Sequence, residues 1–137
     1  METRVAKTLE NHKKGYNCCQ AVACAYCDLV GMDEQIMFRA SEAFGAGMGG
    51  MQTTCGAVSG AVLLAGLKNS CGDLEKPVSK GSTYKLSKEI VARFQEKNGS
   101  VVCKELKGME SGCPLRSCDG CIEDAAALAE EILFNAE

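Results

Sequence analysis

The residues of this sequence best suited to chemistry are its ten cysteines, a high number for a chain of 137 residues. Their thiolate forms attack disulfides and bind metals. Histidine occurs only once, as His12, which disfavours zinc sites of the Cys₂His₂ type and catalysis by a histidine base. The cysteine content therefore predicts thiol redox chemistry or thiolate–metal chemistry.

The elements that must position these cysteines are predicted to be helices. Strand signals are weak, because alternating β-branched residues are missing and Ala and Leu dominate. We expect an all-α fold, a compact helical bundle of about six or seven helices in a single cysteine-rich domain over residues 1–137. The expected helices cover residues 2–13, 17–30, 54–68 and 82–97, one starts at Asp33, a short turn follows Ser100, and the last begins near Asp119. In the helix that starts at Asp33, the predicted inward residues are Ile36, Ala40, Ala43 and Phe44.

Four cysteines fall in the first turns of four different expected helices. They are Cys18 after an Asn17 cap, Cys55 after Thr54, Cys103 after Ser100 and Cys121 after Asp119. Free backbone N–H groups and the positive end of the helix dipole stabilise an anion there and lower a thiol pKa. We expect at least three of the four sulfurs to share one pocket, with Cys55 as the most reactive thiol. The alternative is that these cysteines are buried core residues.

The remaining cysteines give weaker signals. The spacing Cys113-x₄-Cys118-x₂-Cys121 is that of a plant-type [2Fe–2S] loop, and Cys118 to Cys121 also fits a redox C-x-x-C motif. A second C-x-x-C, at Cys24 and Cys27, lies in the middle of an expected helix, where redox motifs are unusual. No role is assigned to Cys71, and Cys19 is expected to be inert core.

A glycine-rich turn, residues 45–50, leads into the expected helix over residues 54–68. Neither a preceding strand nor a Gly-Lys-Ser/Thr sequence is present, so nucleotide binding is disfavoured. Glycines let backbone approach a sulfur closely, so we expect this turn to lie beside Cys55. Gly56 and Gly60, four residues apart, predict either close packing of a neighbouring helix, the commoner reason, or space for a ligand beside Cys55.

Taken together, these motifs resemble the C_GCAxxG_C_C family, whose members are described as redox-active. The matching elements are Gly15-Tyr16-Asn17-Cys18, Cys55-Gly56-Ala57-Val58-Ser59-Gly60, Cys103-Lys104-Glu105-Leu106, and Cys121 before an Ala/Leu/Glu-rich helix. The resemblance runs from about Gly15 to Leu133 and implies Cys18, Cys55, Cys103 and Cys121 as the characteristic cysteines. A similar domain occurs in split-Soret cytochromes, but this chain lacks their C-x-x-C-H haem motif.

Two functional hypotheses follow. The first is a thiol redox or electron-transfer protein, with thiol–disulfide oxidoreductase as the enzyme class, in which Cys55 is the nucleophile and Cys18, Cys103 or Cys121 its resolving partner. The second is a non-enzymatic protein that binds an iron–sulfur cluster or another metal through the same four thiolates, with Cys113 and Cys118 as further ligands. The expected partner is a redox protein or a small-molecule electron acceptor.

Charge and hydropathy limit the other partners. The net charge of −3 and the lack of a basic run disfavour nucleic-acid binding. The most apolar stretch, Cys55 to Leu67, is 13 residues long, whereas a membrane span needs about 20, so no membrane insertion is expected. The charged start of the chain does not resemble a signal peptide, so we expect a cytoplasmic protein. The Ala/Gly-rich segment 54–68 also suits packing against a second copy, which makes a homodimer one expectation.

Overall fold

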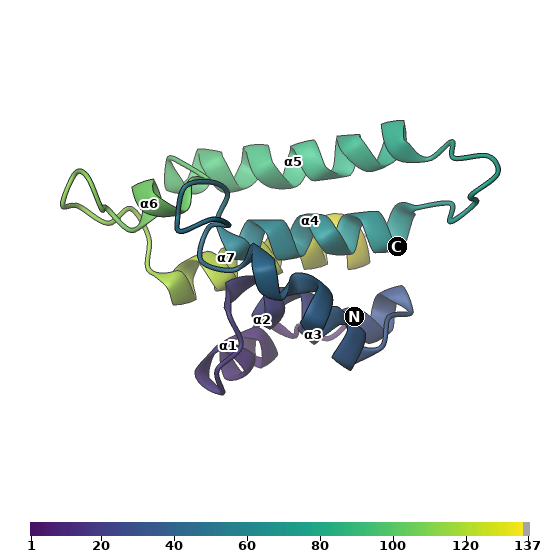
Figure 1. The fold of residues 1–137 in the computed structure, drawn as a ribbon, viewed down its shortest axis with the longest axis horizontal. Coiled ribbons are helices and arrows are strands. Elements are labelled where there is room, and N and C mark those ends of the chain that lie inside the picture. The colour runs from purple at the N-terminus through teal and green to yellow at the C-terminus, as the bar shows by residue number, and fades with distance from the viewer. Residues whose placement is uncertain (136–137) are drawn as a thin grey trace.

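The computed structural model describes residues 1–135, and these fold into helices joined by loops (Figure 1). The all-α prediction is confirmed, since no strand occurs in the described part of the chain beyond one isolated antiparallel bridge between Thr54 and Val102. The α-helices are α1 (Val5–Lys13), α2 (Cys18–Ala25), α3 (Glu34–Ser41), α4 (Gly56–Asn69), α5 (Lys80–Asn98), α6 (Cys103–Leu106) and α7 (Cys118–Ala129). Shorter turns are the 3₁₀-helices η1 (Cys27–Val30) and η2 (Glu42–Phe44) and the π-helix η3 (Glu130–Phe134).

Helix α4 lies at the centre and contacts α2, α5 and α7. Gly56 and Gly60 of this helix face α2: a Cβ added to Gly60 would lie 2.9 Å from the carbonyl oxygen of Cys19, and one added to Gly56 would lie 3.1 Å from the Cys19 nitrogen. The predicted close packing is therefore present, and it lets the two backbones approach. In Figure 1, α4 and α7 both begin at the end of the molecule where α6 lies.

Helix α2 begins as predicted but ends early. The Asn17 side chain accepts a hydrogen bond from the Gln20 N–H, and the Gln20 side chain accepts one from the Asn17 N–H, which completes a capping box. The helix stops at Ala25 and tightens into η1, which ends at the predicted Gly31 in a left-handed conformation with φ of 70°. The expected single helix to Val30 is therefore wrong beyond Ala25.

Helix α3 presents a different face to the core from the one predicted. Ile36 is 55% exposed, Phe44 is 39% exposed, and Ala40 and Ala43 are also exposed. The buried residues are instead Met37 and Ser41, one turn apart. The Ser41 hydroxyl donates a hydrogen bond of 2.7 Å to the Met37 carbonyl, which satisfies its polar group and allows burial.

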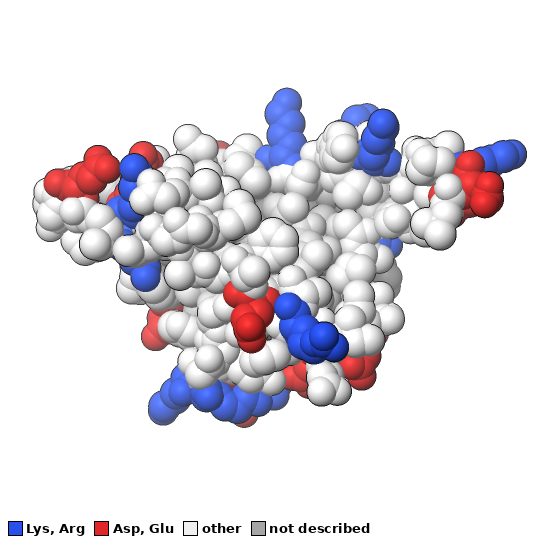
Figure 2. Space-filling view, viewed as in Figure 1, with Lys and Arg blue, Asp and Glu red and all other residues white. Residues whose placement is uncertain are grey.

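The surface of the described residues carries charges of both signs. The face drawn in Figure 2 is mostly uncharged, with separate groups of Lys and Arg and of Asp and Glu side chains mainly around its edges, and neither sign forms a broad patch. No helix among residues 1–135 combines the length and the apolar character that a bilayer span requires.

Candidate functional site

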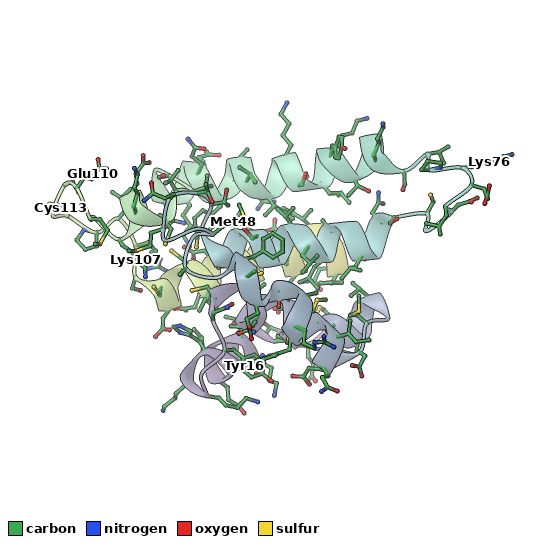
Figure 3. The ribbon with its side chains drawn as sticks, viewed as in Figure 1. Tyr16, Met48, Lys76, Lys107, Glu110 and Cys113 are labelled. Carbon is green, nitrogen blue, oxygen red and sulfur yellow. The ribbon has the colours of Figure 1, made fainter. Side chains whose placement is uncertain are left out.

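Five cysteines line one small cavity at the end of the molecule where α4, α6 and α7 begin. The cavity has a volume of about 20 Å³, and these cysteines are Cys18, Cys55, Cys103, Cys118 and Cys121. The four first-turn cysteines singled out from the sequence are therefore brought together. Cys118 joins them, whereas Cys113 does not line the cavity and lies on the outlying loop between α6 and α7 (Figure 3).

Cys55 occupies the N-cap position of α4, one residue later than the predicted Thr54 cap. Its pKa is lowered to about 7, first because the Cys121 thiol donates a hydrogen bond to its sulfur and next because the backbone N–H groups of Ala57 and Val58 stabilise the thiolate. Burial opposes this shift, and the Lys107 ammonium adds to it. Cys55 is only 5% exposed, so the structure combines a stabilised thiolate with restricted access.

The isolated bridge between Thr54 and Val102 fixes Cys55 relative to Cys103. The Cys55 N–H donates to the Val101 carbonyl at 2.7 Å, and the Cys103 N–H donates to the Thr53 carbonyl at 2.9 Å. Helix α6 begins at Cys103 with Val102 as its cap, not at Ser100 as predicted. Two unrelated chain segments thus bring their cysteines to the same cavity through backbone pairing.

The glycine-rich turn lies against this pair, as expected, but approaches Cys103. Residues 46–51 all have positive φ angles, between 51° and 80°. A Cβ added to Gly47 would clash with the Cys103 side chain, and Ala46 and Gly47 form part of the cavity lining. The turn is closed by a 2.7 Å hydrogen bond from the Met51 N–H to the Ala46 carbonyl. Its left-handed backbone therefore provides the close approach that a side chain would prevent.

The other three predicted thiolates are neutral thiols in this structure. Burial raises the pKa of Cys18 to about 12 and also raises that of Cys103. The pKa of Cys121 is raised, because its proton is held in the hydrogen bond to Cys55 and its surroundings are buried. The expectation that each helix start lowers its cysteine pKa is wrong for these three, because desolvation and the neighbouring thiolate outweigh the helix dipole.

Two cations in the cavity lining, Lys107 and Arg116, were not predicted from the sequence. Lys107 follows Cys103 by four residues, and its ammonium faces Cys118, Cys103 and Cys18. Burial lowers the pKa of Lys107, but these sulfurs outweigh that effect and the net pKa is raised. The Arg116 Nε donates to the buried carboxylate of Asp124 at 3.1 Å. The four-residue spacing of Lys107 from Cys103 is the sequence feature that could have indicated its position.

The remaining cysteines lie outside the cavity. Cys19 is fully buried between α2 and α4, with a pKa raised by burial to about 12, in agreement with the expected core role. Cys24 and Cys27 are nearly buried at the junction of α2 and η1, and burial also raises their pKa values. Cys71 is exposed in the loop after α4, and its pKa is lowered to about 7, mainly by the Ser79 hydroxyl.

All ten cysteines are free thiols in this structure. Within residues 1–135, no group of three or more His, Cys, Asp and Glu side chains has the geometry to hold a metal ion. Metal or iron–sulfur ligation by these cysteines therefore stays a prediction. The arrangement is directly suited to chemistry between two neighbouring thiols, because Cys121 donates to Cys55.

Comparison with known proteins agrees with the sequence motifs. No curated protein and no solved structure shows significant similarity to this chain. One family profile, described as "Putative redox-active protein (C_GCAxxG_C_C)", matches residues 16–132. That range contains the five cysteines of the cavity, both C-x-x-C motifs and the glycine-rich turn. The chain therefore belongs to the C_GCAxxG_C_C family.

Proposed function

We propose that the cavity is a dithiol–disulfide redox centre in which Cys55 is the nucleophile and Cys121 its resolving partner. The observation that carries the proposal is that Cys55 and Cys121 line the same small cavity, where the interaction of their thiols lowers the pKa of Cys55 and raises that of Cys121. A redox dithiol needs one thiolate to attack and one adjacent thiol to complete the disulfide. Of the three partners expected for Cys55, the hydrogen bond favours Cys121 over Cys18 and Cys103.

In the proposed reaction, the Cys55 thiolate attacks an oxidant and Cys121 then attacks the Cys55 sulfur. One S–S bond forms, the two thiols lose two protons and two electrons, and the oxidant takes up the electrons. A reducing partner returns the centre to the dithiol by supplying two electrons and two protons, and the S–S bond breaks. This is the chemistry of a thiol–disulfide oxidoreductase or of an electron carrier.

Lys107 provides the positive charge of this centre. Its ammonium lowers the pKa of Cys55 and faces the sulfurs of Cys118, Cys103 and Cys18. A nearby cation favours the thiolate over the thiol, so Lys107 keeps Cys55 reactive near neutral pH despite its burial. We therefore assign Lys107 a positioning and electrostatic role, without a bond to the reacting atoms.

The test is to oxidise the reduced protein and map its disulfides by peptide mass spectrometry under non-reducing conditions. We expect a Cys55–Cys121 disulfide to form first, and the variants Cys55→Ser and Cys121→Ser to lack it. Cys113→Ser is the matched control, since it removes a cysteine near the same end of the molecule but outside the cavity. A first disulfide that excludes Cys55 would contradict the proposal.

The metal-binding hypothesis makes the opposite prediction for the same residues. A protein purified without oxygen would carry a metal or cluster in stoichiometric amount and would lose it in both Cys55→Ser and Cys121→Ser. Metal analysis of the wild-type protein and these variants would show this directly. Such a result, together with thiols protected from alkylation until the metal is removed, would replace the dithiol proposal.

A further inference from the structure

The size of the cavity limits what can react with Cys55. Its volume is about 20 Å³, while a single water needs about 10–15 Å³ measured in this way. Cys55 is 5% exposed, and Cys103 and Cys121, beside it in the lining, are 5% and 3% exposed. The space next to the Cys55 sulfur therefore accepts a body about the size of one water.

This space does not suit a disulfide as the oxidant. Attack on a disulfide leaves a mixed disulfide, in which a second sulfur and its carbon atoms are attached to Cys55. The Gly47 backbone and the Cys103 side chain are already so close to each other that not even one added Cβ fits between them. A single oxygen atom attached to Cys55, in contrast, fits the volume of the cavity.

The charges around the cavity suit the departure of an anion. Lys107 and Arg116 line it, and no carboxylate or histidine among the described residues does. Arg116 is held by two hydrogen bonds to the buried Asp124, of 3.1 Å from Nε and 3.4 Å from one terminal nitrogen. Fixed cations stabilise a developing alkoxide or hydroxide without reorganisation.

We propose that the oxidant of this centre is a small hydroperoxide, which transfers one oxygen atom to Cys55 inside the cavity. The inference rests on the dithiol function proposed above and names its substrate class. The Cys55 thiolate attacks the terminal peroxide oxygen, the S–O bond forms and the O–O bond breaks. Cys55 is oxidised by two electrons to a sulfenic acid, and the peroxide leaves as hydroxide or alkoxide, which takes a proton from water.

The second step closes the disulfide. The Cys121 sulfur attacks the Cys55 sulfur, the S–S bond forms, the S–O bond breaks, and water leaves with the proton from Cys121. The sum is one hydroperoxide and two thiols converted to one alcohol or water, one further water and one disulfide. Cys121 is suited to this step because its thiol is already hydrogen-bonded to Cys55.

Cys71 provides an internal reference for the test. Its pKa is lowered to about 7, like that of Cys55, but it is exposed in a loop. The reduced wild-type protein is treated with hydrogen peroxide, cumene hydroperoxide or glutathione disulfide, and oxidation at both cysteines is followed in time by quenched peptide mass spectrometry. The ratio of the Cys55 rate to the Cys71 rate cancels the intrinsic reactivity of each oxidant.

We expect this ratio to be higher for hydrogen peroxide than for glutathione disulfide by about tenfold or more, the discrimination that a tight pocket achieves against one excess group. Cumene hydroperoxide should fall between them. In Cys121→Ser, Cys55 should gain one oxygen atom, seen as the mass increase of its peptide, whereas Cys71 should behave as in the wild type.

The two proposals fail in different ways. If the ratio is the same for all three oxidants while the Cys55–Cys121 disulfide still forms, the hydroperoxide inference is overturned and the dithiol function stands. If glutathione disulfide gives the highest ratio, the inference is likewise overturned. If no oxidant produces the Cys55–Cys121 disulfide, both fail.

Discussion

The two ends of helix α4 each carry a cysteine whose pKa is lowered to about 7, but the two cysteines differ in burial and in the side chains around them. Cys55 caps the N-terminal end, is buried and faces Cys121 and Lys107. Cys71 lies just past the C-terminal end, in an exposed loop, where the Ser79 hydroxyl and the N–H groups of Asp73 and Val78 stabilise its thiolate.

Cys55 and Cys71 show that a lowered thiol pKa is not enough to define a redox reaction. The helix dipole favours an anion at Cys55 and disfavours one at Cys71, yet local hydrogen bonds lower both pKa values. Only Cys55 has a neighbouring thiol as donor and a cavity that limits access. A lowered pKa therefore does not identify a redox centre unless a partner thiol accompanies it.

The largest effect, on the rate of Cys121 oxidation, should come from replacing Cys55 or Cys71 with serine, one at a time. Cys55→Ser removes the nucleophile, so the rate of Cys121 oxidation should fall by about two orders of magnitude or more. Cys71→Ser should leave that rate unchanged, because Cys71 does not line the cavity. Time-resolved peptide mapping after a peroxide pulse measures both. Equal losses in the two variants would show that the ends of α4 do not differ in function.

The next largest effect concerns the shape of the cavity. Gly47→Ala forces a Cβ into the Cys103 side chain at a left-handed φ of 68°, and it should lower the free energy of unfolding by about 2–5 kcal/mol. Gly49→Ala is the matched control, with a similar φ of 73° but open space around it. It should cost only about 1–2 kcal/mol. Urea denaturation followed by circular dichroism gives both values, and equal costs would mean that contact with Cys103 is unimportant.

The pH dependence of labelling by hydrogen peroxide, read as oxidation in peptide mass spectrometry, should distinguish Cys55 from a buried cysteine outside the cavity. Thiolate is the reactive form, so Cys55 labelling should rise with pH through a midpoint near 7, whereas Cys24, with a pKa of about 12, should label only at higher pH. Lys107→Gln removes a positive charge that favours the thiolate, so the Cys55 midpoint should move upward. A move of roughly half a pH unit would lower labelling below the midpoint about threefold.

Lys104→Gln is the control for that experiment. It removes the same charge from the same short segment, but Lys104 pairs with Glu110 at 3.3 Å and does not line the cavity. The Cys55 midpoint should stay where it is. If Lys104→Gln moves the midpoint as far as Lys107→Gln does, the effect is the general field of the protein and not a local one.

The smallest effect should be seen in the loop after α4. Ser79→Ala removes the hydroxyl that is the main cause of the lowered pKa of Cys71, so Cys71 should label more slowly at pH 6 to 7. Because Cys71 is exposed, water replaces part of the lost hydrogen bond, and the Cys55 profile should not change. Labelling of both cysteines in one sample provides the test. An unchanged Cys71 profile would mean that the Ser79 hydroxyl does not lower its pKa.

The positions of the cavity cysteines could be predicted from local sequence, but the pKa values of their thiols could not. Helix-capping patterns identify a helix start to within a few residues, which is enough to select Cys18, Cys55, Cys103 and Cys121. A pKa depends on burial and on neighbours from distant parts of the chain, and neither is visible in a capping pattern. The choice of Cys55 as the low-pKa thiol agrees with the structure, and the lowered pKa expected for the other three does not.

The sequence did not reveal which face of a helix packs against its neighbour, and helix α3 is the main example. Helix α3 has apolar residues on more than one side, and the choice of Met37 over Ile36 as the buried residue is made by its packing against α2. Cys118 precedes the predicted helix start at Asp119, whereas the Ser117 cap places it in the first turn of α7. Lys107 and Arg116 were missed because cations on short or irregular segments usually indicate only solvent exposure.

The turn over residues 46–51 has a further consequence that concerns chirality. Six consecutive residues there have the backbone handedness natural to D-amino acids, and three of them, Ala46, Met48 and Met51, are L-residues held against their preference. A chemically synthesised chain with D-alanine at Gly49 and Gly50, whose φ angles of 73° and 80° suit a D-residue, should keep this backbone and lose less entropy on folding. Part of the cavity wall, at Ala46 and Gly47, thus belongs to a turn of six residues with positive φ inside an otherwise right-handed protein.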